Sequence, residues 1–474
     1  MRSYRGRVTL PRPSSPVAAG PALNRAWRVV AGQDPPTGPI ALRARPSALD
    51  DLVAHAALGL ALRIGESMLA VGASAADVTA TVLRVAGAYG LRDCQVDVTF
   101  TSLLVSYDRE GAVPLTAMRS VRVRGTDYAR LQGIAEVARA AGAAEVGVEE
   151  AHRRLDVVVS APPTYRRTVH ALGWVGMAAS VAFLLGGGWL VALTAALTTA
   201  LVEQSMRALN RRGLPLFFQQ AVGAAIATTV AVLLVAWEVQ VRSSLVVAAG
   251  IVVLLAGLSL VGSAQDAISG FPITAAARLF EALTLTAGIV VGIAGVLDVA
   301  QRAQFPLDVS GESQPVLFAV GLAASAGIAG FWALASHARP RAICIAAAAG
   351  ALSWVTSWAA GELGSGPAVA GGLAAVVVGF CGAVLTERLR IAPMLVPVCG
   401  IVPLLPGLAI YHGLFAIVVE GDLQNGLGAL VRATAVGLAL AAGVTLGEYL
   451  GRPLSGGHDR YDRRAHRRAT SSDE

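Results

Sequence analysis

The sequence has no lysine and little charge of any kind. Across its 474 residues, Asp, Glu, Lys and Arg together account for 15%, and all 38 basic residues are arginine. Soluble globular domains carry about 25% charged residues, whereas 55% of this chain is hydrophobic. This composition excludes an intrinsically disordered chain, a collagen-like fibre and a secreted disulfide scaffold. We attribute the missing charge to contact with lipid.

Cysteines and common catalytic motifs are also scarce. Cys94, Cys344, Cys381 and Cys399 are far apart and form no CxxC pair, so we interpret them as reduced core residues. An HExxH motif would indicate a zinc protease, GxxxxGK[ST] a P-loop NTPase and GxSxG a serine hydrolase. The sequence has none of these three motifs. Their absence gives no support for these enzyme classes, and we predict no catalytic residue, metal or cofactor.

Both ends of the chain are basic and polar. Residues 1–48 are rich in Arg, Pro, Ser and Gly and lack the apolar run of a signal peptide, so we predict a disordered cytoplasmic segment. Residues 451–474 predict a similar basic tail. The net charge of +7 would suit nucleic acid, but most arginines lie in the termini and between apolar segments. Membrane topology explains that distribution better, so we predict no nucleic-acid partner.

Residues 49–163 predict a small cytoplasmic α+β domain that begins with two helices. Apolar residues recur every three or four positions, which gives each helix a buried face. Gly72 can end the first helix in the left-handed conformation. Ser74 can cap the second, with Asp77 completing a capping-box-like pair. The predicted buried positions are Val53, Ala57, Leu60, Ile64, Met68 and Val71 on the first helix and Val78, Val82, Val85 and Tyr89 on the second.

The hydrophobic period changes to two after Gly90. Val96, Val98 and Phe100 alternate with polar residues, which is typical of a strand with one buried face. Turn-forming residues and further short alternating or helical patterns follow. The predicted elements are strands at 95–100, 103–107 and 120–124, a turn at 108–111, and helices at 127–141 and 147–159, with Pro162-Pro163 ending the domain.

Long apolar runs dominate the rest of the chain. Each is close to the roughly 20 residues that a helix needs to cross a hydrocarbon layer of about 30 Å. We therefore predict a mainly α-helical membrane protein with ten transmembrane helices. The runs are 169–187, 188–206, 216–237, 244–262, 276–297, 315–335, 341–360, 366–386, 394–418 and 427–450.

Arginines flank these runs unevenly. The loops at 186–188 and 361–366 carry none, whereas other junctions are basic. The positive-inside rule then places both termini and the α+β domain in the cytoplasm, in a multi-pass protein of the plasma membrane. The basic junctions contain Arg166 and Arg167, Arg207, Arg211 and Arg212, Arg339 and Arg341, and Arg388 and Arg390.

The ten runs divide into two sets of five. We predict repeats at 164–300 and 315–450, separated by an extracytoplasmic loop at 301–314. An odd number of helices in each repeat makes the two inverted relative to one another, as in many secondary transporters. Segments that contain glycine or proline interrupt both halves, at 262–272 and 403–422.

Polar side chains in or beside the runs are functional candidates, because such groups are unfavourable in hydrocarbon. The alternative is an interfacial position, which we assign to Glu203, Glu387 and Glu448 at span ends. A proton-coupled carrier needs a group that takes up and releases a proton, and Asp266 and His412 are suitable. Of these two, we prefer Asp266. The other candidates for substrate binding or coupling are Gln265, Arg278, Gln219 and Gln220.

Prolines crowd around the ninth run, and each disturbs a turn of helix. A kinked helix is one interpretation. The other is an unwound segment at Pro403, Pro406 and Gly407 whose free backbone groups face a substrate cavity. That arrangement would suit a zwitterion, which needs acceptors for an ammonium and donors for a carboxylate.

Three separated motifs occur in order along residues 50–450. The first is Leu62-Arg63-Ile64-Gly65-Glu66-Ser67-Met68-Leu69, followed by Gly72-Ala73-Ser74. The second is Val261-Gly262-Ser263-Ala264-Gln265-Asp266-Ala267-Ile268-Ser269-Gly270, followed by Thr274-Ala275-Ala276-Ala277-Arg278, and the third is Val402-Pro403-Leu404-Leu405-Pro406-Gly407. Together they resemble the threonine/serine exporter family, in its actinobacterial form. The resemblance implies export of threonine and serine from the cytoplasm, driven by the proton motive force. The implied partners are these amino acids, protons and the lipid bilayer.

Two other functions stay open on the sequence. Related two-component members of the family are associated with dicarboxylate export, so the substrate could be another small solute. The N-terminal domain has been compared with hydrolases, and Glu66 is the obvious general-base candidate of its motif. No nucleophile or set of metal ligands accompanies Glu66, so the pair Gly65-Glu66 favours a structural role. Whether the chain forms a homo-oligomer also stays open.

Overall fold

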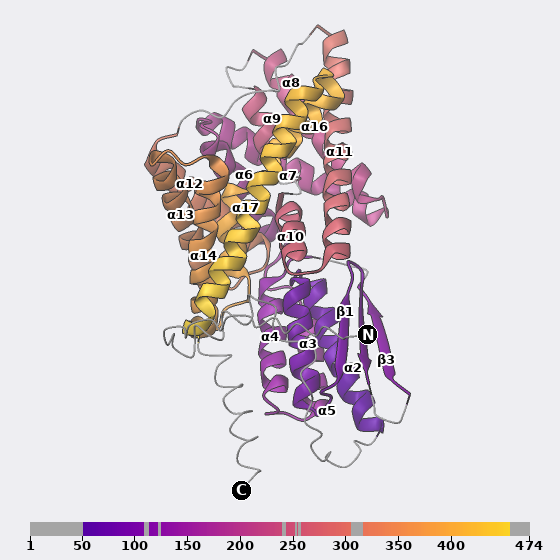
Figure 1. Ribbon diagram of the computed structural model, residues 1–474. Helices are drawn as coiled ribbons and strands as arrows, with labels where there is room; N and C mark the ends of the chain where they lie inside the picture. Colours follow the sequence, from indigo (N-terminus) through magenta and orange to yellow (C-terminus); the bar gives the residue numbers. More distant parts are fainter. Residues whose placement is uncertain are drawn as a thin grey trace, which may run out of the picture. The chain divides into compact units, whose positions relative to one another are not determined.

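The computed structural model describes residues 51–455, with gaps at 109–112, 122–124, 239–242, 252–253, 255–256 and 305–315. The described residues belong to one compact unit. It contains an α+β domain, residues 51–160, followed by a helical region, residues 167–455 (Figure 1). The predicted N-terminal segment, most of the basic tail and most of the predicted extracytoplasmic loop lie outside the described residues.

The α+β domain packs helices against a three-stranded antiparallel sheet whose strands follow chain order. The first pairing runs from Cys94 opposite Tyr107 to Val98 opposite Leu103. The predicted helices are all present. The elements are α2 (Asp51–Ala70), α3 (Ala75–Ala88), β1 (Cys94–Val98), β2 (Ser102–Tyr107), β3 (Leu115–Ser120), α4 (Tyr128–Gly142) and α5 (Val148–Ser160).

Of the strand predicted at residues 120–124, only Ser120 lies in a described strand, at the end of β3, and residues 122–124 lie outside the described residues. The strand β3 ends at Ser120, which pairs with Ser102, while Leu115 pairs with Tyr107. Pairing with the whole of β2 sets the register of β3. The alternation of apolar and polar residues within a segment does not determine this register.

Helix α2 is the central element of the domain and is buried on more than one face. It packs against α3, α4, α5, β2 and β3, and Leu60 and Leu62 are both at most 2% exposed. A Cβ atom at Gly65 would lie 2.5 Å from a Leu103 methyl carbon, so only glycine permits this close approach to the sheet. The prediction that Val53 is buried is wrong: it lies in the first turn and is 45% exposed.

The predicted caps between α2 and α3 are confirmed. Gly72 has φ of +95°, and its N–H donates to the Leu69 carbonyl at 3.2 Å. The Ala73 N–H donates to the Met68 carbonyl at 3.0 Å, which completes a Schellman motif. The Ser74 hydroxyl then accepts a hydrogen bond from the Asp77 N–H at 3.1 Å.

We expect Ser74→Ala to loosen the first turn of α3. Loss of the cap costs about 0.5–2 kcal/mol, which corresponds to roughly 2- to 30-fold more frequent local opening. Hydrogen exchange of the purified protein, followed by mass spectrometry of peptides from α3, measures this change. Thr79→Ala is the matched control, because the Thr79 hydroxyl makes no hydrogen bond to any described residue. Equal exchange rates in the two variants would contradict the capping role.

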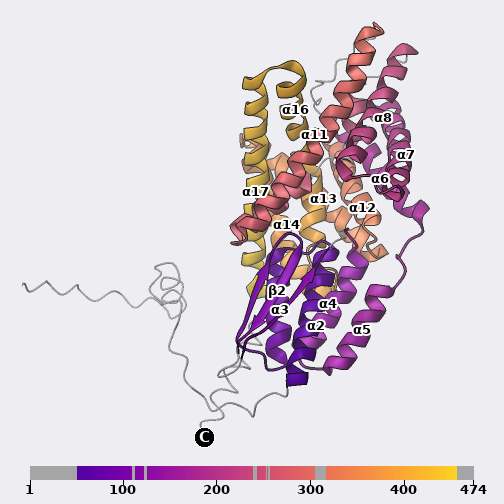
Figure 2. The same ribbon diagram turned by 90° about the vertical axis from the view of Figure 1, so that its right-hand side faces the viewer.

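The helical region follows the order of the predicted apolar runs (Figure 2). Among the described residues, the ninth predicted span is interrupted between α15 and α16. The elements are α6 (Arg167–Leu184), α7 (Trp189–Arg211), α8 (Leu216–Ala236), α9 (Ser243–Ile251), α10 (Gly257–Ile268), α11 (Pro272–Arg302), α12 (Phe318–Ala335), α13 (Pro340–Glu362), α14 (Pro367–Leu389), α15 (Leu395–Ile401), η2 (Val402–Leu404), α16 (Gly407–Phe415), η3 (Ala416–Glu420) and α17 (Leu423–Ser455).

Eight helices among the described residues are long and apolar enough to cross a membrane. One of them is α2, which instead packs inside the α+β domain. The segments 395–404 and 407–420 add a further candidate span that is bent by 42°. The chain is therefore a mainly helical, multi-pass membrane protein with a small sheet domain.

The junction predicted at 262–272, between the fourth and fifth spans, is present but shorter than expected. Residues 262–268 are helical in α10, and only a short turn separates them from α11. Within the fourth predicted span, α9 is described as far as Ile251 and α10 from Gly257, and residues 252–253 and 255–256 lie outside the described residues. Helix α11 also begins before and ends after the fifth predicted span, and it includes Asp298.

Glycines allow very close contact within two helix pairs. A Cβ atom at Gly288 or Gly292 of α11 would overlap backbone oxygens of α8, those of Phe217 and Ala221 respectively. On α17, Gly447 is similarly close to the backbone of α14. Small residues four apart are typical of tightly packed membrane helices, a pattern that our sequence reasoning missed.

The α+β domain is hydrogen-bonded directly to the helical region. The Tyr128 N–H at the start of α4 donates to the Ser336 carbonyl at 2.9 Å. The Gln132 side-chain amide donates to the Arg390 carbonyl at 2.7 Å, and the Thr274 hydroxyl of α11 donates to the Val98 carbonyl at 3.0 Å. One continuous cluster of buried apolar residues includes members of both parts, so the domain is anchored to this end of the helices, called here the domain-side end.

Candidate functional site

Helices α10 and α11 form a hairpin that brings a buried carboxylate beside a guanidinium. The Asp266 carboxylate lies 3.4 Å from the Arg278 guanidinium, and the exposed fractions of these side chains are 2% and 20%. A buried carboxylate requires such a partner, because desolvation of an isolated charge is very unfavourable. The sequence motif therefore encodes an ion pair between two helices.

The hairpin positions this pair through short-range contacts. The Ser263 hydroxyl donates to the Ala275 carbonyl at 2.8 Å, and the Phe271 N–H donates to the Asp266 carbonyl at 2.8 Å. A Cβ atom at Gly262 would lie 2.5 Å from an Arg278 nitrogen. Glycine at this position therefore lets the guanidinium cross over α10.

A cavity of about 80 Å³ lies next to the pair, between the α+β domain and the half-helices α10 and α15. This volume exceeds the roughly 10–15 Å³ of probe-occupied space that one water molecule needs. Both half-helices contribute residues spaced three and four apart, which is one helical face. The lining residues are Val71, Gly72, Thr126, Tyr128 and Leu131 from the domain, Leu258, Val261, Gly262 and Gln265 from α10, Arg278 from α11, Met394, Pro397, Val398 and Ile401 at or just before α15, and Val444 from α17.

Tyr128 is a cavity residue that sequence reasoning missed. It is 3% exposed, and its hydroxyl makes no hydrogen bond to any described residue. Burial raises the pKa of Tyr128 well above its ordinary value, and Cys399 and Trp332 are close enough to affect it. A buried hydroxyl without a partner is unfavourable, so Tyr128 offers a hydrogen-bonding group to a ligand. Its position after Asp127 in the sequence signals only the start of a helix.

The predicted candidates do not all gather at the cavity. Gln265, Arg278 and Gly72 line it, but Gln219 and Gln220 are not among its lining residues. Both glutamines are buried on α8, where the Gln219 amide donates to the Leu214 carbonyl at 2.7 Å.

Pro403, Pro406 and Gly407 form the interruption in the ninth predicted span. A Cβ atom at Gly257 would lie 3.2 Å from the Gly407 nitrogen, so the start of α10 contacts the interruption of the ninth span. Asp266 lies nine residues further along α10, which is about 13 Å along the helix axis. Asp266 and the ninth-span interruption at Pro406 are therefore separated along the axis of α10.

His412 is half-buried on α16, beyond that interruption. Its ring lies 5.3 Å from the Tyr411 ring, measured between centroids. It is not among the residues that line the cavity. The two candidate proton carriers, Asp266 and His412, thus lie in different places.

Comparison with known proteins identifies the family. Residues 59–300 match the family described as "Putative threonine/serine exporter". Residues 321–450 match the one described as "Threonine/Serine exporter, ThrE". The chain belongs to the threonine/serine exporter family. The resemblance predicted from the three motifs is confirmed, and the family is one of transporters and not of enzymes.

Two curated members of the exporter family match over most of their length. The "Probable threonine/serine exporter" of Mycobacterium tuberculosis (strain ATCC 25618 / H37Rv) is 40% identical over 452 residues, which are 93% of this chain and 85% of that protein. The "Threonine/serine exporter" of Corynebacterium glutamicum is 36% identical over 423 residues, 86% of each chain. No solved structure matches the chain.

In the α+β domain, side chains of the first family motif, residues 62–74, make structural contacts. The Glu66 carboxylate pairs with Arg119 at 2.9 Å, and Arg63 pairs with Asp156 and contacts His152. A paired surface carboxylate is poorly suited to act as a general base, so the arrangement offers no support for hydrolysis. Within this motif, Gly65 serves packing, Ser74 caps α3 and Gly72 reaches the cavity.

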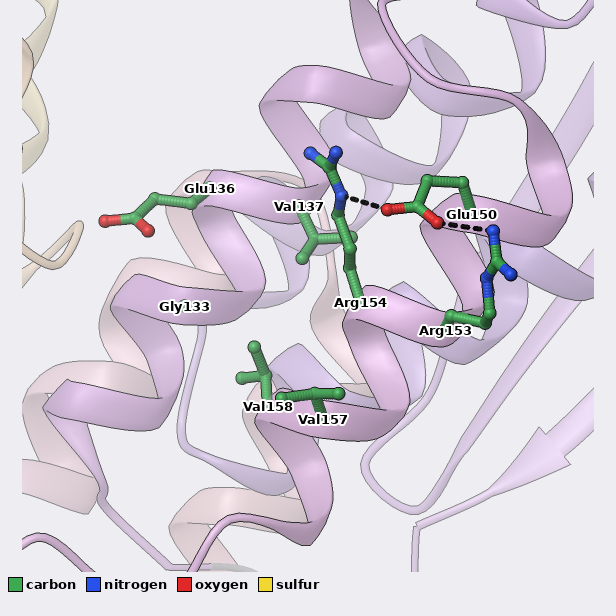
Figure 3. A pocket seen from close by; sticks show the side chains of 8 residues that line it. All are labelled: Gly133, Glu136, Val137, Glu150, Arg153, Arg154, Val157 and Val158. Carbon is green, nitrogen blue, oxygen red and sulfur yellow. Dashed lines mark hydrogen bonds and ion pairs between the residues drawn. The ribbon is translucent and has the colours of Figure 1, made fainter.

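A larger hollow of about 500 Å³ lies on the surface of the α+β domain, between α4 and α5 (Figure 3). Its charges neutralise one another: Glu150 accepts hydrogen bonds from Arg153 and Arg154, both at 2.7 Å. Hydrogen bonds from Arg154 and then Arg153 lower the pKa of the Glu150 carboxyl. Because the hollow is open and its charges are paired, we assign the functional site to the smaller cavity.

Proposed function

We propose that this protein exports threonine and serine from the cytoplasm in exchange for protons. The names of the two curated relatives support the substrates. The observation that carries the mechanism is the Asp266–Arg278 pair beside the cavity. A carboxylate and a guanidinium side by side are complementary to the ammonium and the carboxylate of a zwitterionic amino acid.

The charges at the cavity favour an amino acid over a dicarboxylate. Among the described lining residues, Arg278 is the one charged side chain, and Asp266 neutralises it. An amino acid leaves this pair balanced, since each of its charges meets an opposite charge. A dicarboxylate would bring a second anion towards Asp266 without a second cation. The Tyr128 and Thr126 hydroxyls can hydrogen-bond the hydroxyl that threonine and serine share.

Exchange follows from competition for the same groups. When the substrate carboxylate binds Arg278, Asp266 is released to hold the ammonium. When the substrate leaves, Asp266 binds a proton or returns to Arg278. A proton and an amino acid therefore replace one another at Asp266, so an inward proton gradient can drive outward movement of the amino acid.

Two inverted repeats of five spans would provide the alternating access. The proposed spans are α6, α7, α8, α9–α10 and α11 in one repeat and α12, α13, α14, α15–α16 and α17 in the other. Helix packing supports this pairing, because α8 packs on α11 as α14 packs on α17. The first helices, α6 and α12, pack together, and α10 packs on α17 as α16 packs on α11. The fourth and ninth spans are then equivalent elements.

The domain-side end of the helices is proposed to face the cytoplasm. The basic junctions lie there, including Arg390, whose carbonyl accepts a hydrogen bond from the α+β domain. Trp189 and Trp237 belong to the opposite end in this topology, and both are 72% exposed. Exposed tryptophans suit the membrane–water interface.

Cysteine labelling tests this orientation. With the exposed Cys344 replaced by serine, we expect Leu363→Cys to react with a membrane-impermeant maleimide in intact cells. Leu363 is 87% exposed and lies beyond α13. Arg212→Cys, after α7, should react only after the membrane is made permeable. The reverse pattern would contradict a cytoplasmic α+β domain.

Transport in everted membrane vesicles tests the function. In vesicles that are acidic inside, we expect the protein to accumulate labelled threonine, and an excess of unlabelled serine should reduce the uptake. A protonophore should abolish accumulation. Uptake of a labelled dicarboxylate in place of threonine would overturn the substrate, and accumulation that is unaffected by the protonophore would overturn proton exchange.

A further inference from the structure

A second titratable cluster lies away from the cavity, where α6, α7 and the end of α12 meet. Its centre is His170 in the first turn of α6, whose side chain is 28% exposed. Glu203 of α7 faces it, with the His170 Nε2 atom 3.7 Å from the Glu203 Oε1 atom. The Arg207 side chain donates two hydrogen bonds to the same oxygen, at 2.8 and 3.0 Å.

The two ring nitrogens of His170 have different partners, which define its neutral form. The Nδ1 atom is 2.7 Å from the Ala335 carbonyl oxygen, which can only accept a hydrogen bond. The Nε2 atom accepts from the Trp174 indole N–H at 3.2 Å, and an indole can only donate. The structure therefore holds a neutral imidazole with its hydrogen on Nδ1.

We propose that His170 is a proton-binding site of this protein, in which proton uptake exchanges the hydrogen bond from Trp174 for an ion pair with Glu203. A proton from solvent adds to Nε2, so this atom can no longer accept from the indole and becomes a donor. The Glu203 carboxylate is the anion within reach. The hydrogen bond from the Nδ1–H group to the Ala335 carbonyl oxygen is kept, so the ring needs only a small movement.

The other charged groups around His170 permit this step. The His337 ring stacks on it, with centroids 5.1 Å apart and planes inclined by 11°, and two positive imidazoles in this arrangement would repel. Burial lowers the pKa of His337, an effect that Asp127 opposes and that His170 and Arg130 reinforce. His337 is therefore neutral at pH 7, and His170 can accept a proton without that repulsion. The remaining nearby charges are Arg207 on α7, Arg166 and Arg167 at the start of α6, and Arg339 after His337.

The hydrogen bond that protonation breaks connects to the cavity wall. Trp174 packs edge-to-face against Trp332 at 5.4 Å, and Trp332 lies close enough to affect the Tyr128 hydroxyl. Ser336, next to Ala335, accepts the hydrogen bond from the Tyr128 N–H. Proton binding at His170 would thus loosen the packing behind a cavity residue. Only this consequence rests on the proposed function, because proton binding itself can be measured without any substrate.

Nuclear magnetic resonance of histidine-labelled, full-length protein in detergent tests the proposal. The His170 signals are assigned by their loss in His170→Gln. At pH 8 we expect nitrogen shifts of a neutral ring protonated at Nδ1. Glu203→Gln should weaken proton binding about tenfold by removing the anion. Trp174→Phe should strengthen it about two- to tenfold, because the neutral ring loses its donor.

Glu362→Gln is the matched control, since this exposed carboxylate lies at the end of α13. It should leave the His170 titration unchanged. Any one of three results would overturn the proposal. The first is a His170 ring protonated at Nε2 at pH 8, and the second is the absence of His170 titration between pH 5 and 8. The third is unchanged proton binding in both Glu203→Gln and Trp174→Phe. Two substitutions with opposite expected effects keep the test decisive if one variant does not fold. Failure of threonine transport with the expected titration intact would overturn the proposed function alone.

Discussion

Asp266→Asn is expected to abolish threonine export driven by a pH gradient while the protein stays inserted in the membrane. An amide has nearly the size of a carboxyl group but cannot bind and release a proton. It also lacks the charge that holds an ammonium, and a charge-assisted hydrogen bond is worth about 1.5–3 kcal/mol, or roughly 10- to 150-fold in substrate affinity. Accumulation of labelled threonine in everted vesicles measures the loss, and residual passive exchange is compatible with it.

The matched control is Asp298→Asn on the same helical region. Asp298 also pairs with an arginine, Arg302, at 2.8 Å, but its side chain is 58% exposed, so its loss should leave transport intact. His412→Ala tests the rival proton carrier and should have the milder effect. Gradient-driven export at the wild-type rate by the Asp266→Asn protein would refute the proposed coupling.

Gly292→Val is expected to prevent α8 and α11 from packing. A Cβ atom at Gly292 would overlap the Ala221 carbonyl oxygen and also meets two further backbone atoms of that residue within 3.0 Å. Overpacking a core typically costs about 1–3 kcal/mol. Here the neighbour is helix backbone, which cannot change rotamer to give way, so we expect an effect at or above this range. The yield of monodisperse protein and its thermal unfolding temperature in detergent measure it.

Gly295→Val on the same helix is the control. A Cβ atom there meets no atom within 4 Å, so this substitution changes the helix propensity without the overlap. If both variants lose the same stability, close packing of α8 against α11 is not the reason why position 292 is a glycine.

Much of the fold could be predicted from local patterns. The Schellman motif at Gly72 and the cap at Ser74 depend on residues within one turn of each other, so their sequence signature is sufficient. The order of the long helices follows from the apolar runs, because each run is long enough to specify a helix by itself. The strand β3 could not be placed from local patterns, because its register depends on pairing with β2.

The candidate site was only partly predictable. Asp266 and Arg278 are twelve positions apart, and the motif containing them suggested a role for both. Their ion pair depends on the hairpin between α10 and α11, whose turn was expected to be a longer break. Tyr128 lies more than 130 residues before Asp266 in the chain, so no local pattern could place it at the same cavity.

The sequence by itself determined that this chain enters a membrane, where its helix caps lie, and which family it resembles. These properties depend on composition and on residues close to one another along the chain. Only the tertiary structure decided that α2 is the central helix of the α+β domain, packed against three helices and two strands. It also decided that Tyr128 joins the cavity and that His170 faces Glu203. The physical reason is that burial and pairing are properties of the elements that surround a residue, and those elements come from distant parts of the chain.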